Sequence, residues 1–111
     1  MASHPIVHID IAGPDEAAQQ RFYADLLGWS VDPKGPGYAL LTTPAGSPNG
    51  ALIEAETASV TVGVAVPDLD AALARVNALG GVVTMPSTDN GWVVKAQVTD
   101  PAGNVLTLIQ A

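Results

Sequence analysis

The polar side chains that are able to act on a bound molecule lie within short apolar runs of this chain. His8 and Asp10 alternate with apolar residues near the start, and Lys95, Gln97 and Thr107 do so near the end. Imidazole and carboxylate groups exchange protons, whereas ammonium, amide and hydroxyl groups bind the oxygen atoms of a ligand. The pattern indicates a small polar site carried on an apolar frame.

Each of these residues admits more than one role. His8 is a metal ligand, a general acid or base, or, in the simplest interpretation, a hydrogen-bonding residue of a pocket wall. Asp10 and Lys95 form an ion pair or reach solvent, or else Lys95 binds a substrate carboxylate or enolate while Asp10 moves a proton. Tyr38 and Trp92 open expected strands, where they stack on a planar ligand or pack in a core or dimer. The catalytic candidates are therefore His8 and Asp10, and the ligand-binding candidates are Tyr38, Thr61, Trp92, Lys95, Gln97 and Thr107.

The composition excludes several classes of function. The 111 residues carry a net charge of -7 with only four Lys and Arg, which argues against nucleic acid and against an anionic membrane surface as partners. The chain has no cysteine and no GxSxG or GxGxxG pattern, so thiol, nucleophile-elbow and dinucleotide chemistry are unsupported. No segment approaches the roughly 20 apolar residues of a membrane span, and the start lacks the basic region of a signal peptide. We expect a cytoplasmic protein.

An internal repeat organises the chain. Asp15 and Asp68 each follow a proline and stand 53 residues apart, as do Gly28 and Gly81. The aspartates are expected to cap two helices that the glycines end. These helices cover residues 16–27 and 69–79, and the strands expected around them are 6–11, 29–31, 38–43, 51–55, 60–66, 82–85, 92–99 and 105–110. The order βαβββ thus occurs twice within one domain of residues 1–111, as module 4–56 and module 59–111.

One apolar stripe on each expected helix predicts the side that packs against a sheet. The stripes are Ala18, Phe22 and Leu26 in the first helix, and Leu69, Leu73, Val76 and Leu79 in the second. Alternation along the strands turns the polar residues to the opposite side of each sheet. The residues expected there, lining a cavity, are His8, Asp10, Thr61, Lys95, Gln97 and Thr107.

Three segments carry a resemblance to a known superfamily. They are RFYADLLGW at residues 21–29, the Val66-Pro67-Asp68 that leads into LDAALARVNALGG, and the turn DPAGN at residues 100–104. Their order and spacing resemble the vicinal oxygen chelate superfamily of glyoxalases, bleomycin-resistance proteins and dioxygenases, most closely its short lactoylglutathione lyase-related members. The resemblance implies an α+β fold of two tandem βαβββ modules that form a curved mixed sheet around a cavity, and it implies a homodimer.

The resemblance also implies where a metal ion would bind. Metal-dependent members place a His or Gln in the first strand, a Glu in the fourth, a His in the fifth and a Glu in the last. Here the first position is His8, the fifth-strand position is Thr61 and the last is Thr107, while the fourth is Ala51 or, in a shifted register, Glu54. Threonine is a poor ligand, and a site for Zn, Ni, Mn or Fe needs about three N or O donors.

We therefore expect a metal-independent protein that binds a small molecule and carries no cofactor. The first alternative is a lyase, isomerase or dioxygenase that acts on a small vicinal-oxygen substrate, either by enolisation or with a divalent metal held by His8 and Glu54. The second alternative is a stress or scaffold protein whose duplicated fold serves dimerisation.

Overall fold

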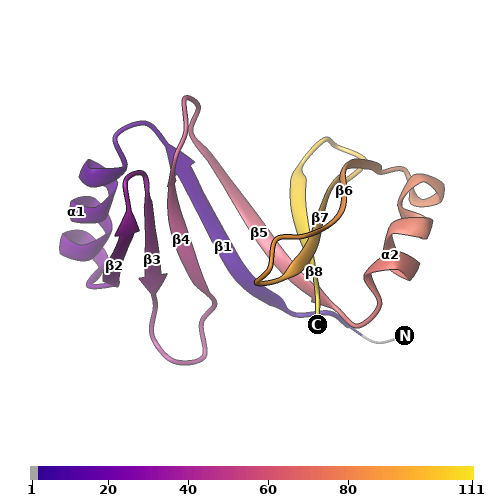
Figure 1. The fold of residues 1–111 in the computed structure, drawn as a ribbon, viewed down its shortest axis with the longest axis horizontal. Coiled ribbons are helices and arrows are strands. Elements are labelled where there is room, and N and C mark those ends of the chain that lie inside the picture. The colour runs from indigo at the N-terminus through magenta and orange to yellow at the C-terminus, as the bar shows by residue number, and fades with distance from the viewer. Residues whose placement is uncertain (1–2) are drawn as a thin grey trace. The chain divides into compact units, whose positions relative to one another are not determined.

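The computed structural model describes residues 3–111 as an α+β protein in which the order βαβββ occurs twice (Figure 1). The first set is β1 (Ile6–Gly13), α1 (Glu16–Leu27), β2 (Ser30–Gly35), β3 (Tyr38–Thr42) and β4 (Asn49–Glu54). The second set is β5 (Ser59–Val66), α2 (Leu69–Val76), the short 3₁₀ helix η1 (Asn77–Leu79), β6 (Val82–Asp89), β7 (Val94–Thr99) and β8 (Val105–Gln110). The predicted fold class and element order are confirmed.

By their internal contacts the described residues fall into two compact units. The N-terminal unit is His8–Thr61, and the C-terminal unit contains Val62 onward together with the chain up to Val7. The first residues belong to the C-terminal unit because the amide of Ala65 donates a hydrogen bond of 3.0 Å to the carbonyl of Pro5. In both units the sheet pairs its first and last strands in parallel and its other strands antiparallel, with orders β2-β3-β4-β1 and β5-β8-β7-β6.

Both helices begin at the predicted aspartates. The carboxylate of Asp15 accepts from the amide of Ala18 at 3.2 Å, and that of Asp68 accepts from the amide of Ala71 at 3.0 Å. Each bond satisfies an amide that lacks a partner within the first helical turn. Gly28 ends α1 in the left-handed conformation, with φ of 71°, as predicted.

The two edge strands extend further than the sequence predicts. β2 continues through Pro33 to Gly35, and β6 continues through Pro86 to Asp89. Proline has no backbone N–H to donate. An edge strand tolerates this, because no strand lies on one of its two sides to accept a hydrogen bond. In both strands the register also shifts near the proline. The prediction that Trp92 opens β7 is wrong, because β7 begins at Val94.

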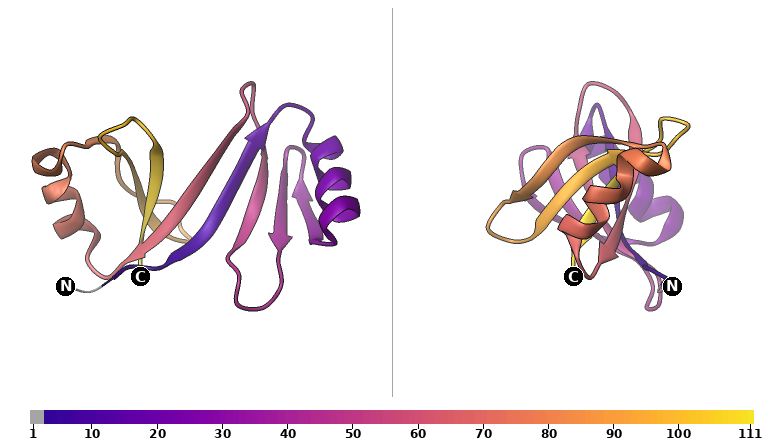
Figure 2. Two further views of the ribbon diagram at one scale, coloured as in Figure 1. Left: turned by 180° about the vertical axis from the view of Figure 1, so that it is seen from behind. Right: turned by 90° about the vertical axis from the view of Figure 1, so that its right-hand side faces the viewer.

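In each unit the helix lies on one side of the sheet (Figure 2). A small apolar core lies within each unit. In the N-terminal unit the core is Ala39, Leu41 and Leu52, with Ile11, Tyr23, Trp29 and Val31 packed against it. In the C-terminal unit it is Val66, Leu69 and Ala96, with Val64, Ala72, Leu73, Val94 and Leu108 around it. These sets confirm the predicted alternation, because Ile11, Val64 and Leu108 all lie on the helix side of their sheets.

The predicted stripe of α1 is wrong. Phe22 and Leu26 are 53% and 64% exposed, and Tyr23 packs against the core in their place. The ring of Tyr23 stacks on Trp29 with centroids 5.6 Å apart and planes 6° apart. Successive helix residues point about 100° apart, so turning Tyr23 inward leaves Phe22 outside. In α2 Leu69 and Leu73 do pack inward, whereas Leu79, which lies in η1, is 63% exposed.

The turn between β7 and β8 is closed by one carboxylate. Asp100 accepts hydrogen bonds of 2.9 Å from the amides of Ala102 and Asn104 and from the side-chain amide of Asn104. The hydrogen bond from the Asn104 side chain, followed by those from the backbone, holds the pKa of the Asp100 carboxyl below its usual value of 3.8.

A lowered pKa in the folded protein makes Asp100 a source of acid sensitivity. Its contribution to stability is present above the unfolded pKa and is lost as the pH falls through the lower folded pKa. Replacing Asp100 by alanine should lower Tm slightly at pH 7, and the two Tm curves should converge as the pH falls well below 3.8. Thermal melts at several pH values measure this, and a Tm difference that does not change with pH would contradict it.

Within residues 3–111, no helix is both long enough and apolar enough to cross a membrane.

Candidate functional site

The face of the N-terminal sheet that points away from α1 carries most of the candidate residues of that unit. Pairing places Asp10 of β1 opposite Ala51 of β4, and Ala51 opposite Leu40 of β3, so these side chains share one face. We call this surface the N-terminal open face. It comprises His8, Asp10, Asp32, Tyr38, Leu40, Thr42, Asn49, Ala51 and Ile53.

His8 and Asp10 are directly bonded to each other on this face. Nε2 of His8 lies 2.7 Å from Oδ1 of Asp10, and the two side chains are 33% and 24% exposed. An ionised carboxylate only accepts hydrogen bonds, so Nε2 carries the hydrogen. In the neutral ring Nδ1 is then left with a lone pair that accepts a hydrogen bond or a proton. The sequence raised Lys95 as an ionic partner of Asp10, and the partner that the structure gives it is His8.

The corresponding face of the C-terminal sheet is also polar. Thr107 of β8 pairs with Gly63 of β5 and with Gln97 of β7, and Lys95 pairs with Ile109. These side chains point away from the core residues Val64, Ala96 and Leu108 on the same strands. This C-terminal open face comprises Gly63, Ala65, Met85, Lys95, Gln97, Thr107 and Ile109, and alternation along β5 directs Thr61 the same way. The pairing agrees with the predicted orientation of Lys95, Gln97 and Thr107, and their role in binding stays a prediction.

Trp92 lies at the tip of the hairpin between β6 and β7 and is 91% exposed. The side chain of Asn90 accepts from the amides of Trp92 at 2.9 Å and Val93 at 3.0 Å, and this fixes the turn. Trp92 therefore lies outside the regular strands that form the C-terminal open face. Its contact with a ligand stays a prediction.

Glu54 binds the beginning of α1. Its two carboxylate oxygens accept from the amides of Asp15 and Glu16, both at 2.9 Å. At the end of β8, Gln110 does the same for α2, since its Oε1 accepts from the amide of Leu69 at 2.8 Å. Sequence reasoning missed both contacts. The available signal was that each of these long polar side chains ends the last strand of its module.

The residues present do not fit the metal site of the metal-dependent relatives. β1 and β4 are parallel, with His8 opposite Asn49 and Glu54 opposite Gly13, so His8 and Glu54 lie five positions apart along the sheet. That separation is about 16 Å at the rise of a strand, too far for one ion to bind both.

The fourth-strand position itself is occupied by Ala51, because Ala51 pairs with β1 as Thr107 pairs with β5. The four positions therefore hold His8, Ala51, Thr61 and Thr107, which supply a single good ligand. Within residues 3–111, no three His, Cys, Asp or Glu side chains cluster as metal ligands would.

Removing the Glu54 carboxylate should weaken the protein by exposing two helix amides without partners. We expect Glu54→Ala to lower the free energy of unfolding by about 1–3 kcal/mol, and Glu54→Gln by less because it keeps one acceptor. Denaturant titration followed by circular dichroism measures both values. Gln110→Ala is the matched comparison in the C-terminal unit, and it should also destabilise the protein because it leaves the amide of Leu69 without its acceptor. A Glu54→Ala variant as stable as wild type would show that the contact contributes nothing.

Comparison with known protein families decides the superfamily. Residues 6–109 match a family described as the glyoxalase-like domain. This chain belongs to the glyoxalase-like domain family. The match confirms the predicted superfamily, which includes the glyoxalases, bleomycin-resistance proteins and dioxygenases.

Individual relatives of this glyoxalase-like domain agree with that assignment. It is 32% identical to "Putative glyoxylase CFP32" of Mycobacterium bovis over 93% of its own length, but it spans only 44% of that relative. Its fold is similar to a glyoxalase/bleomycin resistance protein/dioxygenase superfamily member from Vibrio splendidus (TM-score 0.74, 20% identity, 98% of this chain and 100% of that one). It is also similar to methylmalonyl-CoA epimerase from Mycobacterium tuberculosis (TM-score 0.75, 19% identity, 99% and 91%). At these identities the two structures show the fold alone.

Proposed function

We propose that this glyoxalase-like domain binds a small organic molecule, and does so without a resident metal ion. The observation that carries the proposal is the N-terminal open face, on which the bonded His8–Asp10 pair shares a surface with Tyr38 and Leu40. Tyr38 and Leu40 are 41% and 37% exposed. Small-molecule sites combine apolar side chains of this kind with a few placed polar groups.

The polar groups of the open faces indicate the chemistry of the ligand. Nδ1 of His8 is free to accept from an N–H or O–H group, and the Tyr38 ring offers a surface for stacking. The C-terminal open face by itself offers the ammonium of Lys95 and the amide of Gln97, both of which bind oxygen, whereas Thr107 is only 4% exposed. We infer a planar organic ligand with an O–H or N–H group for the N-terminal open face, and a carboxylate or enolate oxygen as the group that the C-terminal open face would bind.

A thermal-shift screen of planar carboxylic acids and phenols tests this proposal. Hits are then titrated calorimetrically against wild type, His8→Ala and Tyr38→Ala. Each substitution on the open face should raise Kd by about five- to thirtyfold, since a lost hydrogen bond or stacking contact is worth about 1–2 kcal/mol. His4→Ala is the matched control, because His4 is exposed and lies outside the strands. Hits whose affinity is the same in His8→Ala and Tyr38→Ala would overturn the proposed site.

Elemental analysis tests the metal-independent part of the proposal. Protein purified without chelators and dialysed against Zn, Ni, Mn and Fe(II) should hold no stoichiometric metal, in wild type and in His8→Ala alike. Tight metal that disappears in His8→Ala would instead favour a metal-dependent lyase, isomerase or dioxygenase.

The His8–Asp10 bond favours a second candidate, an isomerase or lyase that acts by enolisation. Asp10 would hold the ring of His8 through Nε2–H, and Nδ1 would take a proton from carbon next to a substrate carbonyl. Exchange of that hydrogen for deuterium in a bound ligand, seen by NMR, is the sensitive readout. Exchange that is lost in His8→Ala and in Asp10→Asn would make this candidate the leading one.

We further propose that the domain forms a homodimer. Phe22 and Leu26 of α1, which are 53% and 64% exposed, support this proposal, because large apolar residues left exposed side by side are typical of contact surfaces. The cytoplasmic location and the closer likeness to lactoylglutathione lyase-related proteins stay predictions.

A further inference from the structure

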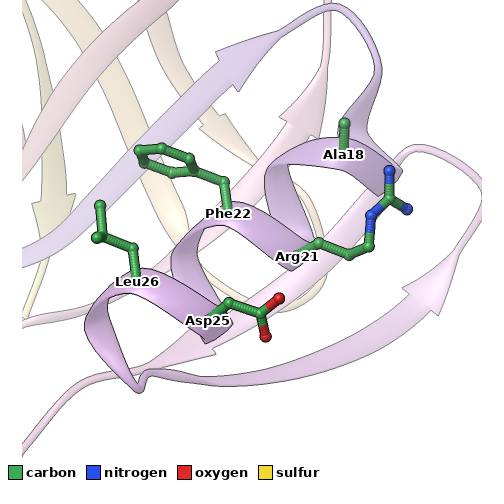
Figure 3. A pocket seen from close by; sticks show the side chains of 5 residues that line it. All are labelled: Ala18, Arg21, Phe22, Asp25 and Leu26. Atoms are coloured by element: carbon green, nitrogen blue, oxygen red, sulfur yellow. The ribbon is translucent and has the colours of Figure 1, made fainter.

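The outward side of α1 has the composition of a contact surface. Ala18, Arg21, Phe22, Asp25 and Leu26 recur at helical spacing and line one shallow depression (Figure 3). The helix uses Tyr23 to pack on its own sheet, and none of these five residues is among those packed directly against the core of the unit. Two adjoining large apolar residues left half or more exposed are typical of an interaction surface. We call these five residues the α1 patch.

Phe22 is held in place at the centre of the α1 patch. Its ring meets the ring of Tyr23 edge to face, with centroids 5.1 Å apart and planes 87° apart. Tyr23 is itself stacked on Trp29, so the core supports the orientation of the exposed ring. A rigid aromatic side chain that loses little rotational freedom on binding is the usual anchor of a protein contact.

The charges of the α1 patch are balanced and unpaired. Arg21 and Asp25 lie one turn apart along the same edge of the patch, beside the apolar side chains (Figure 3). Within residues 3–111 the ion pairs are His8–Asp10 and Lys34–Asp32, so neither charge is in one. The chain has only four Lys and Arg against eleven Asp and Glu, and its net charge of -7 makes two copies repel each other on average. The α1 patch is locally neutral.

We propose that the α1 patch is the contact between two copies of this chain, with the two α1 helices packed antiparallel about a two-fold axis near Phe22. This inference rests on the proposed homodimer and is independent of the proposed ligand. A two-fold contact must be self-complementary. With Phe22 at the axis, Ala18 of one copy faces Leu26 of the other. The small side chain of Ala18 leaves room for the larger side chain of Leu26.

The charged edges also match in this arrangement. The two-fold axis brings the charged edge of one helix beside the charged edge of the other, in reversed order. Arg21 then lies two residues from the position that faces Asp25 of the second copy, an offset of about 3 Å along the helix. The long arginine side chain spans that offset, so each dimer contains two such ion pairs.

Analytical ultracentrifugation of the chain over a concentration series tests the proposal. Wild type should show a reversible dimer, and Phe22→Glu should weaken it by about thirtyfold or more, as expected for a central aromatic anchor. Leu79→Glu is the matched control, because Leu79 is a large apolar residue that is even more exposed than Phe22 but lies in η1. Circular dichroism confirms that each variant is folded. A wild type that stays monomeric overturns both the homodimer and the contact, whereas a dimer unaffected by Phe22→Glu overturns the contact alone.

A charge exchange provides the sharper test. Arg21→Glu and Asp25→Arg should each weaken the dimer, because each places like charges opposite one another. The double variant R21E/D25R restores opposite charges across the axis and should recover most of the wild-type affinity. Recovery cannot arise from damage to the fold. A double variant at least as weak as the worse single variant would contradict the antiparallel arrangement.

Discussion

Replacing Gly50 by alanine is expected to destabilise this protein more than any other single methyl group added to it. Gly50 is buried in β4 and pairs with Ile9 of the parallel strand β1. A Cβ atom there would overlap the carbonyl oxygen of Ile9 and lie 3.2 Å from its carbonyl carbon. These are backbone atoms of the neighbouring strand, so no change of rotamer relieves the overlap. The pairing of β1 with β4 must open locally.

The expected loss in the free energy of unfolding is about 3 kcal/mol or more, which corresponds to a fall in Tm of about 10 °C or more. Urea titration of Gly50→Ala against wild type measures it. Gly46→Ala is the control, because Gly46 lies in the preceding loop with φ of 90°, and a Cβ atom added there would meet no other atom within 4 Å. That change should cost only about 1 kcal/mol of backbone strain. Equal stability of the two variants would contradict the tight approach of β1 and β4.

The second large effect is expected at Leu52, which is 1% exposed at the centre of the N-terminal core. Leu52→Ala should lower the free energy of unfolding by about 3–5 kcal/mol, because it removes buried apolar surface and leaves a cavity. Leu40→Ala makes the same chemical change on β3, on the other side of the same sheet, where the side chain is 37% exposed. It should cost about 1 kcal/mol or less.

For ligand binding we expect the opposite order of effects, with the larger change in Kd caused by Leu40→Ala and not by Leu52→Ala. Leu40 lies on the N-terminal open face, so Leu40→Ala should weaken the binding of a screened ligand while leaving the protein folded. Leu52→Ala should leave Kd unchanged at temperatures where the variant is still folded. Calorimetric titration of both variants, with stability measured in parallel, checks the expectation. A ligand insensitive to Leu40→Ala would show that it does not use this part of the face.

The repeat and the alternation in the sequence predicted most of this architecture. Asp15 and Asp68 cap their helices as expected, and the strands run in the predicted order. Alternation correctly directed His8, Lys95 and Thr107 away from the cores. These features depend on local conformation and on a period of two residues, both of which are present in the sequence itself.

The remaining features depend on contacts between distant segments. The rotation of α1 about its axis is set by the stacking of Tyr23 on Trp29 and by Glu54, which comes 38 residues after Glu16 and bonds its amide. Helical periodicity allowed either Phe22 or Tyr23 to face the sheet, since both rings are apolar. The register of β4 likewise could not be read locally, because one pairing puts Ala51 at the fourth-strand position and another puts Glu54 there.

Pairing of β4 with β1 resolved that register and assigned Glu54 to the helix. The chain's own residues therefore specify its elements and their polar faces through short-range conformational preferences. Packing across the sheet determined which side of α1 is left exposed and which carboxylate was available to a ligand, because both depend on side chains that meet only after the strands have paired.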